Sequence, residues 1–435
     1  LGIIQVIQNC ALKTANLHKF KRMDVKRILI IGLVWPEPKS SAAGTRMIQL
    51  INLFLSQEFE VIFATAASKS EFSHNLSDLG VIEKEIKLND HSFNLFLKDI
   101  YPDLVLFDRF MMEEQFGWRV SQECPEAMKI LDTEDLHCLR HARQQAIKTG
   151  GSLAETDLFS TMAKREIASI LRCDLSLIIS EVEMNILQEV FHVDPGLIYY
   201  LPFLEHPLTE EKVLNWKPFE QREGFVFIGN YLHEPNWHTL QTLKTRIWPG
   251  LRKSLPTVGM HIYGAYPSQK VMQLHNDKER FYVHGRADDA RDVIASHKVL
   301  LAPIQFGAGV KGKFIDAMQV GTPAVTTTLG AEAMKGTLEW NGAIADDPEL
   351  FITQAVTLYQ DKELWQQAQQ DGINIINKRY AKLTDGQSFI EQLQALASNL
   401  KAHRNHNFIG QILQHHSANS TKYMSLWIEE KNKSK

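Results

Sequence analysis

The sequence predicts an α/β protein built from two Rossmann-like, doubly wound lobes that face a central cleft. The chain has 435 residues, more than one hydrophobic core usually supports. Short β-branched apolar runs alternate with segments of helical period, as they do in parallel sheets. This alternation stops at a polar stretch and then starts again, which indicates a second lobe.

The first lobe is predicted over residues 23–205. Its strands are expected in six apolar runs, at 27–32, 61–64, 103–107, 128–131, 175–179 and 197–201. The stretch 206–223 has no apolar period and is predicted to be a linker. Residues 1–22 are set apart as an extension of uncertain origin, because the chain opens on Leu1 and Met23 is a candidate start.

The second lobe is predicted over residues 224–390. Its strands are expected in five runs, at 224–229, 258–264, 280–284, 299–303 and 322–327. Residues 391–435 are predicted to form C-terminal helices, and a return of these helices to the first lobe is left open. Ligands of such folds bind at the carboxyl ends of the strands, so functional residues are expected in the loops that follow strands.

Composition excludes several classes of protein. The 47 basic and 51 acidic residues give a net charge of −4, which offers no basic field for a nucleic acid. Four cysteines without CxxC spacing favour neither a disulfide framework nor a zinc ribbon. No apolar run approaches the roughly 18 residues of a membrane span. We therefore expect a cytoplasmic protein, and the basic residues before Met23 leave contact with the inner face of a membrane open.

The most informative segment is a strand, loop, helix and strand over residues 301–325. Gly307, Gly309 and Gly312 leave room for a ligand close to the backbone, and the helix start offers free N–H groups. A helix start carries only about half an elementary charge, less than a diphosphate needs. Lys311 and Lys313 would add charge-assisted contacts of about 1.5–3 kcal/mol each. The alternative is a pair of solvated lysines beside a helix.

A carboxylate close to this loop has two interpretations. Asp316, one turn into the helix, could bind ribose hydroxyls or only complement the helix dipole.

The sequence has no DxD pair to hold a metal ion. The spacing of His137 and His141 could place two imidazoles on one helical face, but HExxH is missing and no third ligand is evident. No metal site is therefore predicted.

A series of motifs in the second lobe resembles the donor lobe of family 4 glycosyltransferases, retaining enzymes of the GT-B fold. The motifs follow one another in the family's order at Phe227-Ile-Gly, Pro235-Asn-Trp, Ile262-Tyr-Gly, His284-Gly-Arg, 302–313 and 325–332. The resemblance is strong over residues 224–335, moderate over 27–205 and weak at both ends. In the first lobe, the segment 35–46 looks like the family's first loop, whose glycine would be Gly44.

The resemblance implies roles for named residues. The donor-binding set comprises Gly44, Gly229, Gly264, Arg286, Gly307, Gly309, Asp316 and Glu332. Lys311 and Lys313 would stabilise the leaving diphosphate, and His137, on the acceptor side, would approach the sugar. For Arg286 a surface position is an equal alternative. Without the family, Gly44 merely opens a helix, and the absence of GxGxxG after the first strand disfavours a dehydrogenase.

Two positions depart from the family pattern. Its first loop carboxylate, eight positions before Asp316, is replaced by Ala308, which puts contacts to the donor sugar in doubt. The family's Gly-Ala-Glu-Gly run ends here on Ala333, which adds one methyl group to that loop.

The resemblance implies transfer of a hexosyl group from a nucleotide-diphosphate sugar to a glycan, lipid-linked or protein acceptor. Retention at the anomeric carbon is implied, with no metal and no cofactor beyond the donor substrate. Two alternatives stay open, a sugar-nucleotide epimerase on the same fold and a non-catalytic nucleotide-sugar-binding protein.

Overall fold

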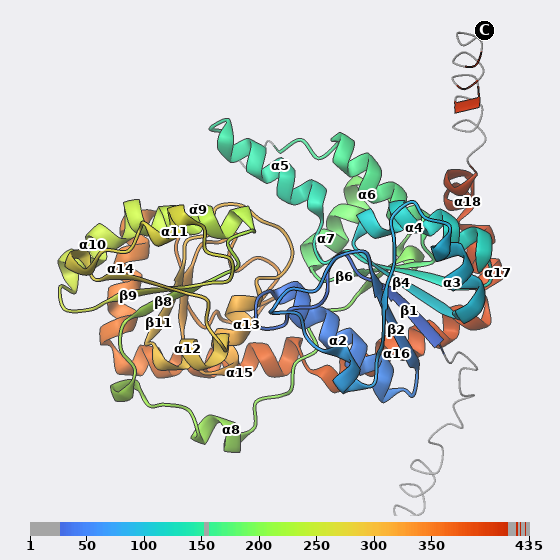
Figure 1. The fold of residues 1–435 in the computed structure, drawn as a ribbon. Coiled ribbons are helices and arrows are strands. Elements are labelled where there is room, and N and C mark those ends of the chain that lie inside the picture. Colours follow the sequence, from blue (N-terminus) through green and yellow to red (C-terminus); the bar gives the residue numbers. More distant parts are fainter. Residues whose placement is uncertain (1–26, 152–155, 416–422, 425–426, 428–430, 432–435) are drawn as a thin grey trace, which may run out of the picture.

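The protein consists of two lobes placed side by side, each a parallel sheet covered by helices (Figure 1). The structure is a computed structural model that describes residues 27–151 and 156–415 and residues 423, 424, 427 and 431. The extension expected at 1–22 lies outside the described residues.

The first lobe is built on seven strands in the order β3-β2-β1-β4-β5-β6-β7, all paired in parallel. The strands are β1 (Arg27–Ile31), β2 (Glu60–Thr65), β3 (Ile82–Glu85), β4 (Leu104–Asp108), β5 (Met128–Asp132), β6 (Leu175–Ile178) and β7 (Ile198–Tyr200). The strand order reverses between β1 and β4, and this switch point opens a crevice at the carboxyl ends of the strands.

Helices cover both faces of this sheet. They are α2 (Ala42–Ser56), α3 (Ser92–Ile100), α4 (Phe110–Glu123), α5 (His137–Lys148), α6 (Thr161–Arg172) and α7 (Glu181–Asn185). Because successive strand residues point to opposite faces, Leu29 and Ile31 belong to one core cluster and Ile28 and Ile30 to another. The continuous apolar runs of the sequence thus reflect a sheet buried on both sides.

The second lobe repeats this topology with six parallel strands in the order β10-β9-β8-β11-β12-β13. The strands are β8 (Phe225–Ile228), β9 (Met260–Tyr263), β10 (Phe281–Gly285), β11 (Val299–Ala302), β12 (Ala324–Thr326) and β13 (Gly342–Ile344). The helices around them are α9 (Glu234–Thr242), α10 (Trp248–Ser254), α11 (Gln269–Met272), α12 (Ala290–Ser296), α13 (Gly312–Gln319), α14 (Pro348–Gln360) and α15 (Lys362–Arg379). The predicted two-lobed architecture is confirmed.

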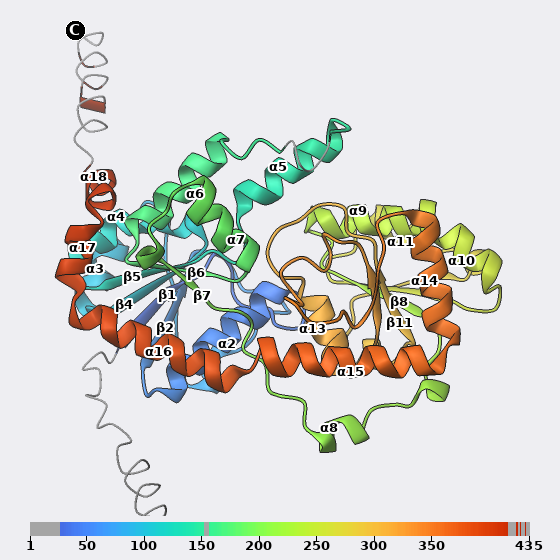
Figure 2. The ribbon, with the colours of Figure 1, turned by 180° about the vertical axis from the view of Figure 1, so that it is seen from behind.

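The chain passes between the lobes twice. The first passage, after β7, includes the short helix α8 (Glu210–Leu214). The second lies beside it, where the Glu205 amide donates to the Tyr380 carbonyl at 2.8 Å. From there α16 (Lys382–Ser398) runs along the first lobe (Figure 2).

Helix α16 belongs to the core of the first lobe. Phe389 and Leu393 are buried in the same cluster as Ile28, so the domain boundary expected at residue 390 falls inside this helix. The following helices, α17 (Leu400–His406) and α18 (Phe408–Gln414), stay on this lobe. There Arg404 pairs with Asp174 at 2.8 Å.

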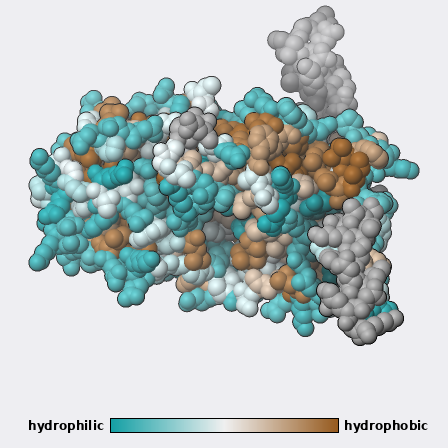
Figure 3. Space-filling model, turned by 90° about the horizontal axis from the view of Figure 1, so that it is seen from above, coloured by the Kyte–Doolittle hydropathy of each residue, from teal (hydrophilic) through white to brown (hydrophobic). Residues whose placement is uncertain are grey.

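The surface seen from above is largely hydrophilic over the second lobe, and its larger apolar groups lie over the first lobe (Figure 3). Exposed apolar side chains of the first lobe include Trp118 and Phe159, which are 44% and 65% exposed. No helix among the described residues is both long enough and apolar enough to cross a membrane.

Candidate active site

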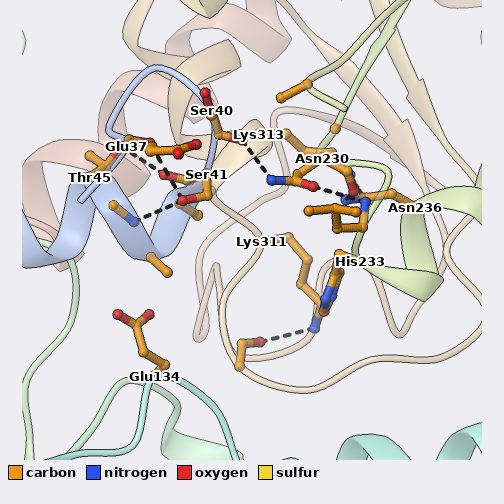
Figure 4. A pocket seen from close by; sticks show the side chains of 18 of the residues that line it. Glu37, Ser40, Ser41, Thr45, Glu134, Asn230, His233, Asn236, Lys311 and Lys313 are labelled. Carbon is orange, nitrogen blue, oxygen red and sulfur yellow. Dashed lines mark hydrogen bonds between the residues drawn. The ribbon is translucent and has the colours of Figure 1, made fainter. Parts of the chain in front are cut away.

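A cavity of about 550 Å³ lies between the lobes, and loops at the carboxyl ends of both sheets line it. The first lobe contributes the loops after β1, β4 and β5, and the second contributes those after β8, β9, β10 and β11. Ten predicted site residues line this cavity: Gly44, His137, Gly229, Gly264, Arg286, Gly307, Gly309, Lys311, Lys313 and Asp316. Figure 4 shows part of this wall, with Lys311 and Lys313 across the cavity from α2.

The glycines of the 307–313 loop permit a close approach of the lobes. Gly309 has a φ of +62°, and a Cβ there would lie 2.8 Å from the Asp135 Cβ. A Cβ on Gly312 would lie 2.7 Å from the Ala42 Cβ. The N-terminus of α13 therefore lies against the N-terminus of α2, where Ser41 caps the helix by accepting from the Gly44 amide at 3.0 Å. Two helix starts share one cavity, an arrangement that favours anions.

Both lysines of this loop are half-buried and directed by local contacts. Lys311 Nζ donates to the Gly309 carbonyl at 3.0 Å. Lys313 Nζ donates to Asn236 Oδ1 at 2.6 Å and lies 4.6 Å from the centre of the Phe227 ring. Burial lowers the pKa of Lys311 to about 8 and that of Lys313 to about 7, the latter also through the charge of Lys311. No carboxylate pairs with either ammonium within hydrogen-bond distance among the described residues, so both are available to an anion.

Asp316 and Arg286 are both engaged by neighbours. Asp316 Oδ1 accepts from Arg291 Nε at 2.8 Å, and burial raises the pKa of this carboxyl although Arg291 opposes the shift. Arg286 stacks on Phe72 of the opposite lobe, 4.1 Å from its ring centre, and approaches Ser40 Oγ at 3.5 Å. Arg286 therefore lies where the lobes meet at the cavity.

Glu332 lies outside the cavity wall. Its carboxylate forms a two-bond ion pair with Arg143 of the first lobe, at 2.7 and 2.8 Å. The structure thus places this residue in a contact between lobes.

The other predicted glycines serve close packing around the cavity. A Cβ on Gly44 would lie 2.4 Å from the Glu37 carbonyl carbon, inside the loop after β1. A Cβ on Gly264 would lie 2.0 Å from the carbonyl oxygen of Gly229, and one on Gly229 would meet the Asn236 side chain. These glycines bring the backbone of three loops close to the cavity.

His137 begins α5 and is held by the surrounding acidic groups. Its Nδ1 lies 3.1 Å from the Asp135 carbonyl and 3.4 Å from Glu166 Oε1. His141 is exposed and contacts Gln145 at 3.4 Å. Over the ranges that the structure describes, no three His, Cys, Asp or Glu side chains are grouped as ligands for a metal ion.

Sequence reasoning missed Glu134, which reaches into the cavity from the loop after β5 (Figure 4). Its φ is +61°, a conformation that is strained for a residue with a side chain. Its buried Oε1 has no hydrogen-bond partner among the described residues. Burial raises the pKa of Glu134 to about 8, reinforced by Asp132 and opposed by Arg109. No sequence pattern marks a glutamate with this backbone.

A second group missed from sequence joins the lobes at the cavity rim. Tyr266, from the loop after β9, donates to the Glu37 carboxylate at 2.8 Å, and Asn230 Nδ2 donates to the Ser40 carbonyl at 3.4 Å. These contacts pair residues more than 180 positions apart in sequence.

Comparisons with known proteins agree with this geometry. Residues 222–361 match a family model described as "Glycosyl transferases group 1". No curated protein matches the chain.

Three solved structures illustrate the shared fold. Sucrose-phosphate synthase from Thermosynechococcus elongatus is 14% identical, with a TM-score of 0.63 over 86% of this chain and 99% of that chain. HepE from Anabaena, solved with UDP and glucose, is 14% identical, with a TM-score of 0.64 over 85% and 100%. TarM from S. aureus, solved as a mutant with Fondaparinux, alpha-GlcNAc-glycerol and UDP, is 10% identical, with a TM-score of 0.62 over 85% and 99%. The chain has the GT-B fold of glycosyltransferases.

Proposed function

We propose that this protein transfers a hexosyl group from a nucleotide-diphosphate sugar to a hydroxyl group of a glycan, lipid-linked or protein acceptor. One observation carries the proposal. Lys311 and Lys313 flank the start of α13, which lies against the start of α2, and residues of both helix starts line the same cavity. The match of residues 222–361 to group 1 glycosyl transferases supports glycosyl transfer as the use of this site.

Cleavage of the bond between sugar and diphosphate leaves negative charge on the diphosphate. Two ammonium groups and two helix starts would stabilise this charge, and closure of the cleft around the donor would exclude water and strengthen these contacts. Each charge-assisted contact contributes on the order of 1.5–3 kcal/mol. Arg286, at the junction of the lobes, can add a third cation.

This arrangement requires no protein nucleophile and no metal ion. The proposal therefore includes metal independence and, from the resemblance to family 4 enzymes, retention at the anomeric carbon. In such a reaction the acceptor hydroxyl attacks the anomeric carbon on the face that the diphosphate leaves, and its proton passes to the departing phosphate. A cytoplasmic location and the absence of a cofactor remain predictions from the sequence.

Uridine compounds are the first probes to use, because HepE and TarM were solved with UDP. The test incubates UDP-glucose and related UDP-, GDP- and ADP-sugars with the protein and follows the anomeric proton by nuclear magnetic resonance. With an octyl glycoside acceptor, the proposal predicts a new α-configured glycoside from an α-configured donor. Without acceptor, it predicts slow hydrolysis or no change.

The same spectra test the alternatives. A new epimer of the donor would favour the epimerase. Nucleotide binding without turnover across a wide panel of acceptors would favour a non-catalytic binding protein.

A further inference from the structure

The loop that carries the two lysines has backbone partners on the opposite lobe. The Gly307 carbonyl accepts a hydrogen bond from Arg143 Nη1 at 2.9 Å. The Gly309 amide donates to Glu183 Oε1 at 2.8 Å. Arg143 lies in α5 and Glu183 in α7, and both side chains are buried. The first lobe therefore satisfies polar backbone groups of a loop that belongs to the second.

Each of these two residues is itself fixed by a second contact. The Arg143 guanidinium also forms the two-bond ion pair with Glu332, in the loop after β12. Glu183 Oε1 also accepts from the Leu136 amide at 3.0 Å, directly before α5. A planar guanidinium held at two carboxylate oxygens has little freedom to turn. We call Arg143 and Glu183, with their contacts, the brace; it joins the loops after β11 and β12 of the second lobe to α5 and α7 of the first.

The braced loop has little internal support for its shape. Gly307 and Gly309 have φ values of +156° and +62°, outside any helix or strand. If the lobes separated, the Gly307 carbonyl and the Gly309 amide would both exchange a protein partner for water. Glycine can adopt many backbone conformations, and the turn would then lose the contacts that stabilise the observed one.

We propose that Arg143 and Glu183 are positioning residues that couple docking of the lobes to the shape of the diphosphate-binding loop. Neither side chain lines the cavity, so both act through the loop. By thermodynamic reciprocity, a ligand that favours the braced loop also favours the docked lobes. The identity of the ligand rests on the proposed function, whereas the brace is a property of the protein alone.

The experiment combines calorimetric titration with UDP and hydrogen exchange of the free protein. Arg143→Met removes the guanidinium and keeps the length of the side chain. Its control is Arg165→Met, which removes an ion pair with Glu114 inside the first lobe. Arg143→Met is expected to weaken UDP binding at least tenfold and to speed exchange at the Gly309 amide at least tenfold. Exchange in β8 and β11 and the behaviour of Arg165→Met are expected to match wild type.

A milder variant protects the test against a folding defect. Glu332→Gln removes one charge of the ion pair and is expected to shift both readings in the same direction by about threefold or more. The double variant is expected to lose no more affinity than Arg143→Met alone, because both changes break one unit.

Several outcomes would overturn the proposal. One is UDP affinity within twofold of wild type in Arg143→Met. Another is lost affinity with unchanged exchange at Gly309, which would indicate a purely electrostatic effect. Exchange that rises equally over both lobes would indicate general destabilisation. If wild type bound neither UDP, GDP nor ADP, the proposed function would fail, while exchange at Gly309 would still report on the brace.

Discussion

In the free protein Lys311 and Lys313 are only partly protonated near neutral pH, and a bound anion would favour their protonated form. Burial lowers their pKa values to about 8 and 7, so both are partly neutral at pH 7–8 in the free protein. A bound diphosphate favours the protonated form and raises these pKa values. Binding should therefore take up protons.

This linkage predicts how affinity depends on pH. Nucleoside diphosphate affinity should be highest near pH 7 and should fall as pH rises to 9, by about tenfold for each pKa unit that binding restores. Calorimetric titration in two buffers of different ionisation enthalpy measures the proton uptake. A flat affinity from pH 7 to 9, with no dependence of the enthalpy on buffer, would contradict it.

The raised pKa of Glu134 is predicted to lower the stability of the folded protein as pH rises from about 4.5 to 8. Its pKa is raised to about 8 in the folded protein, above the usual 4.5, so the stability tied to its neutral form is lost as pH rises through 8. Glu134→Gln stays neutral, so its melting temperature should gain on wild type between about pH 4.5 and 8 and level off above pH 8, by about 2–4 °C per kcal/mol. Thermal unfolding across this range is the measurement. A constant difference between the two proteins would show that Glu134 does not titrate there.

The 307–313 loop and α13 form one element whose shape depends on glycine. Gly309→Ala should abolish detectable nucleotide binding, because the new methyl group would meet Asp135 and the backbone has positive φ. Gly80→Ala is the matched control, since Gly80 has a φ of +82° and open space around it. The control should cost about 1–2 kcal/mol of stability, because alanine adopts positive φ at a penalty, and leave affinity unchanged. Equal nucleotide affinity of Gly309→Ala and Gly80→Ala would contradict a role of this loop in nucleotide binding.

The edge of the second sheet carries a stack of histidines. His261 Nδ1 of β9 lies 3.0 Å from His284 Nε2 of β10, and burial, with His297 and His284, lowers the pKa of His261 to about 4. A depressed pKa means that stability is lost as pH falls from about 6.5 towards 4. The melting temperature of His261→Gln, measured relative to that of wild type, should therefore rise as pH is lowered from about 6.5 to 4. A difference that stays constant with pH would contradict this assignment.

The elements that the sequence predicted well are those buried on both faces. The strands β1, β4 and β11 are continuous apolar runs, and the loop after β11 carries glycines and lysines at fixed spacing. The edge strands β3 and β13 were missed, because β3 is polar and largely exposed and β13 is a half-buried Gly-Ala-Ile segment. A strand that buries little leaves little periodic signal.

Contacts between the lobes could not be read from one sequence. The partners of Glu332 and Gly309 lie 189 and 126 positions away. The fold decides such pairs, and no local pattern encodes them. Ten of the eleven candidate site residues named from the sequence therefore lie in the cavity wall, but the sequence did not reveal the contacts of Arg143 and Glu183 behind the wall or the backbone strain at Glu134.

The two lobes form one site, because the two lysines come from one lobe and the start of α2 comes from the other. We infer that this junction binds a nucleoside diphosphate through Lys313. The decisive measurement is calorimetric titration of UDP, GDP and ADP into wild type, Lys313→Met and the exposed control Lys253→Met. We predict that wild type binds at least one of them, that Lys253→Met matches it, and that Lys313→Met weakens binding at least tenfold, about 1.4 kcal/mol. Equal affinity in wild type and Lys313→Met, or no binding of any of the three to wild type, would contradict the claim.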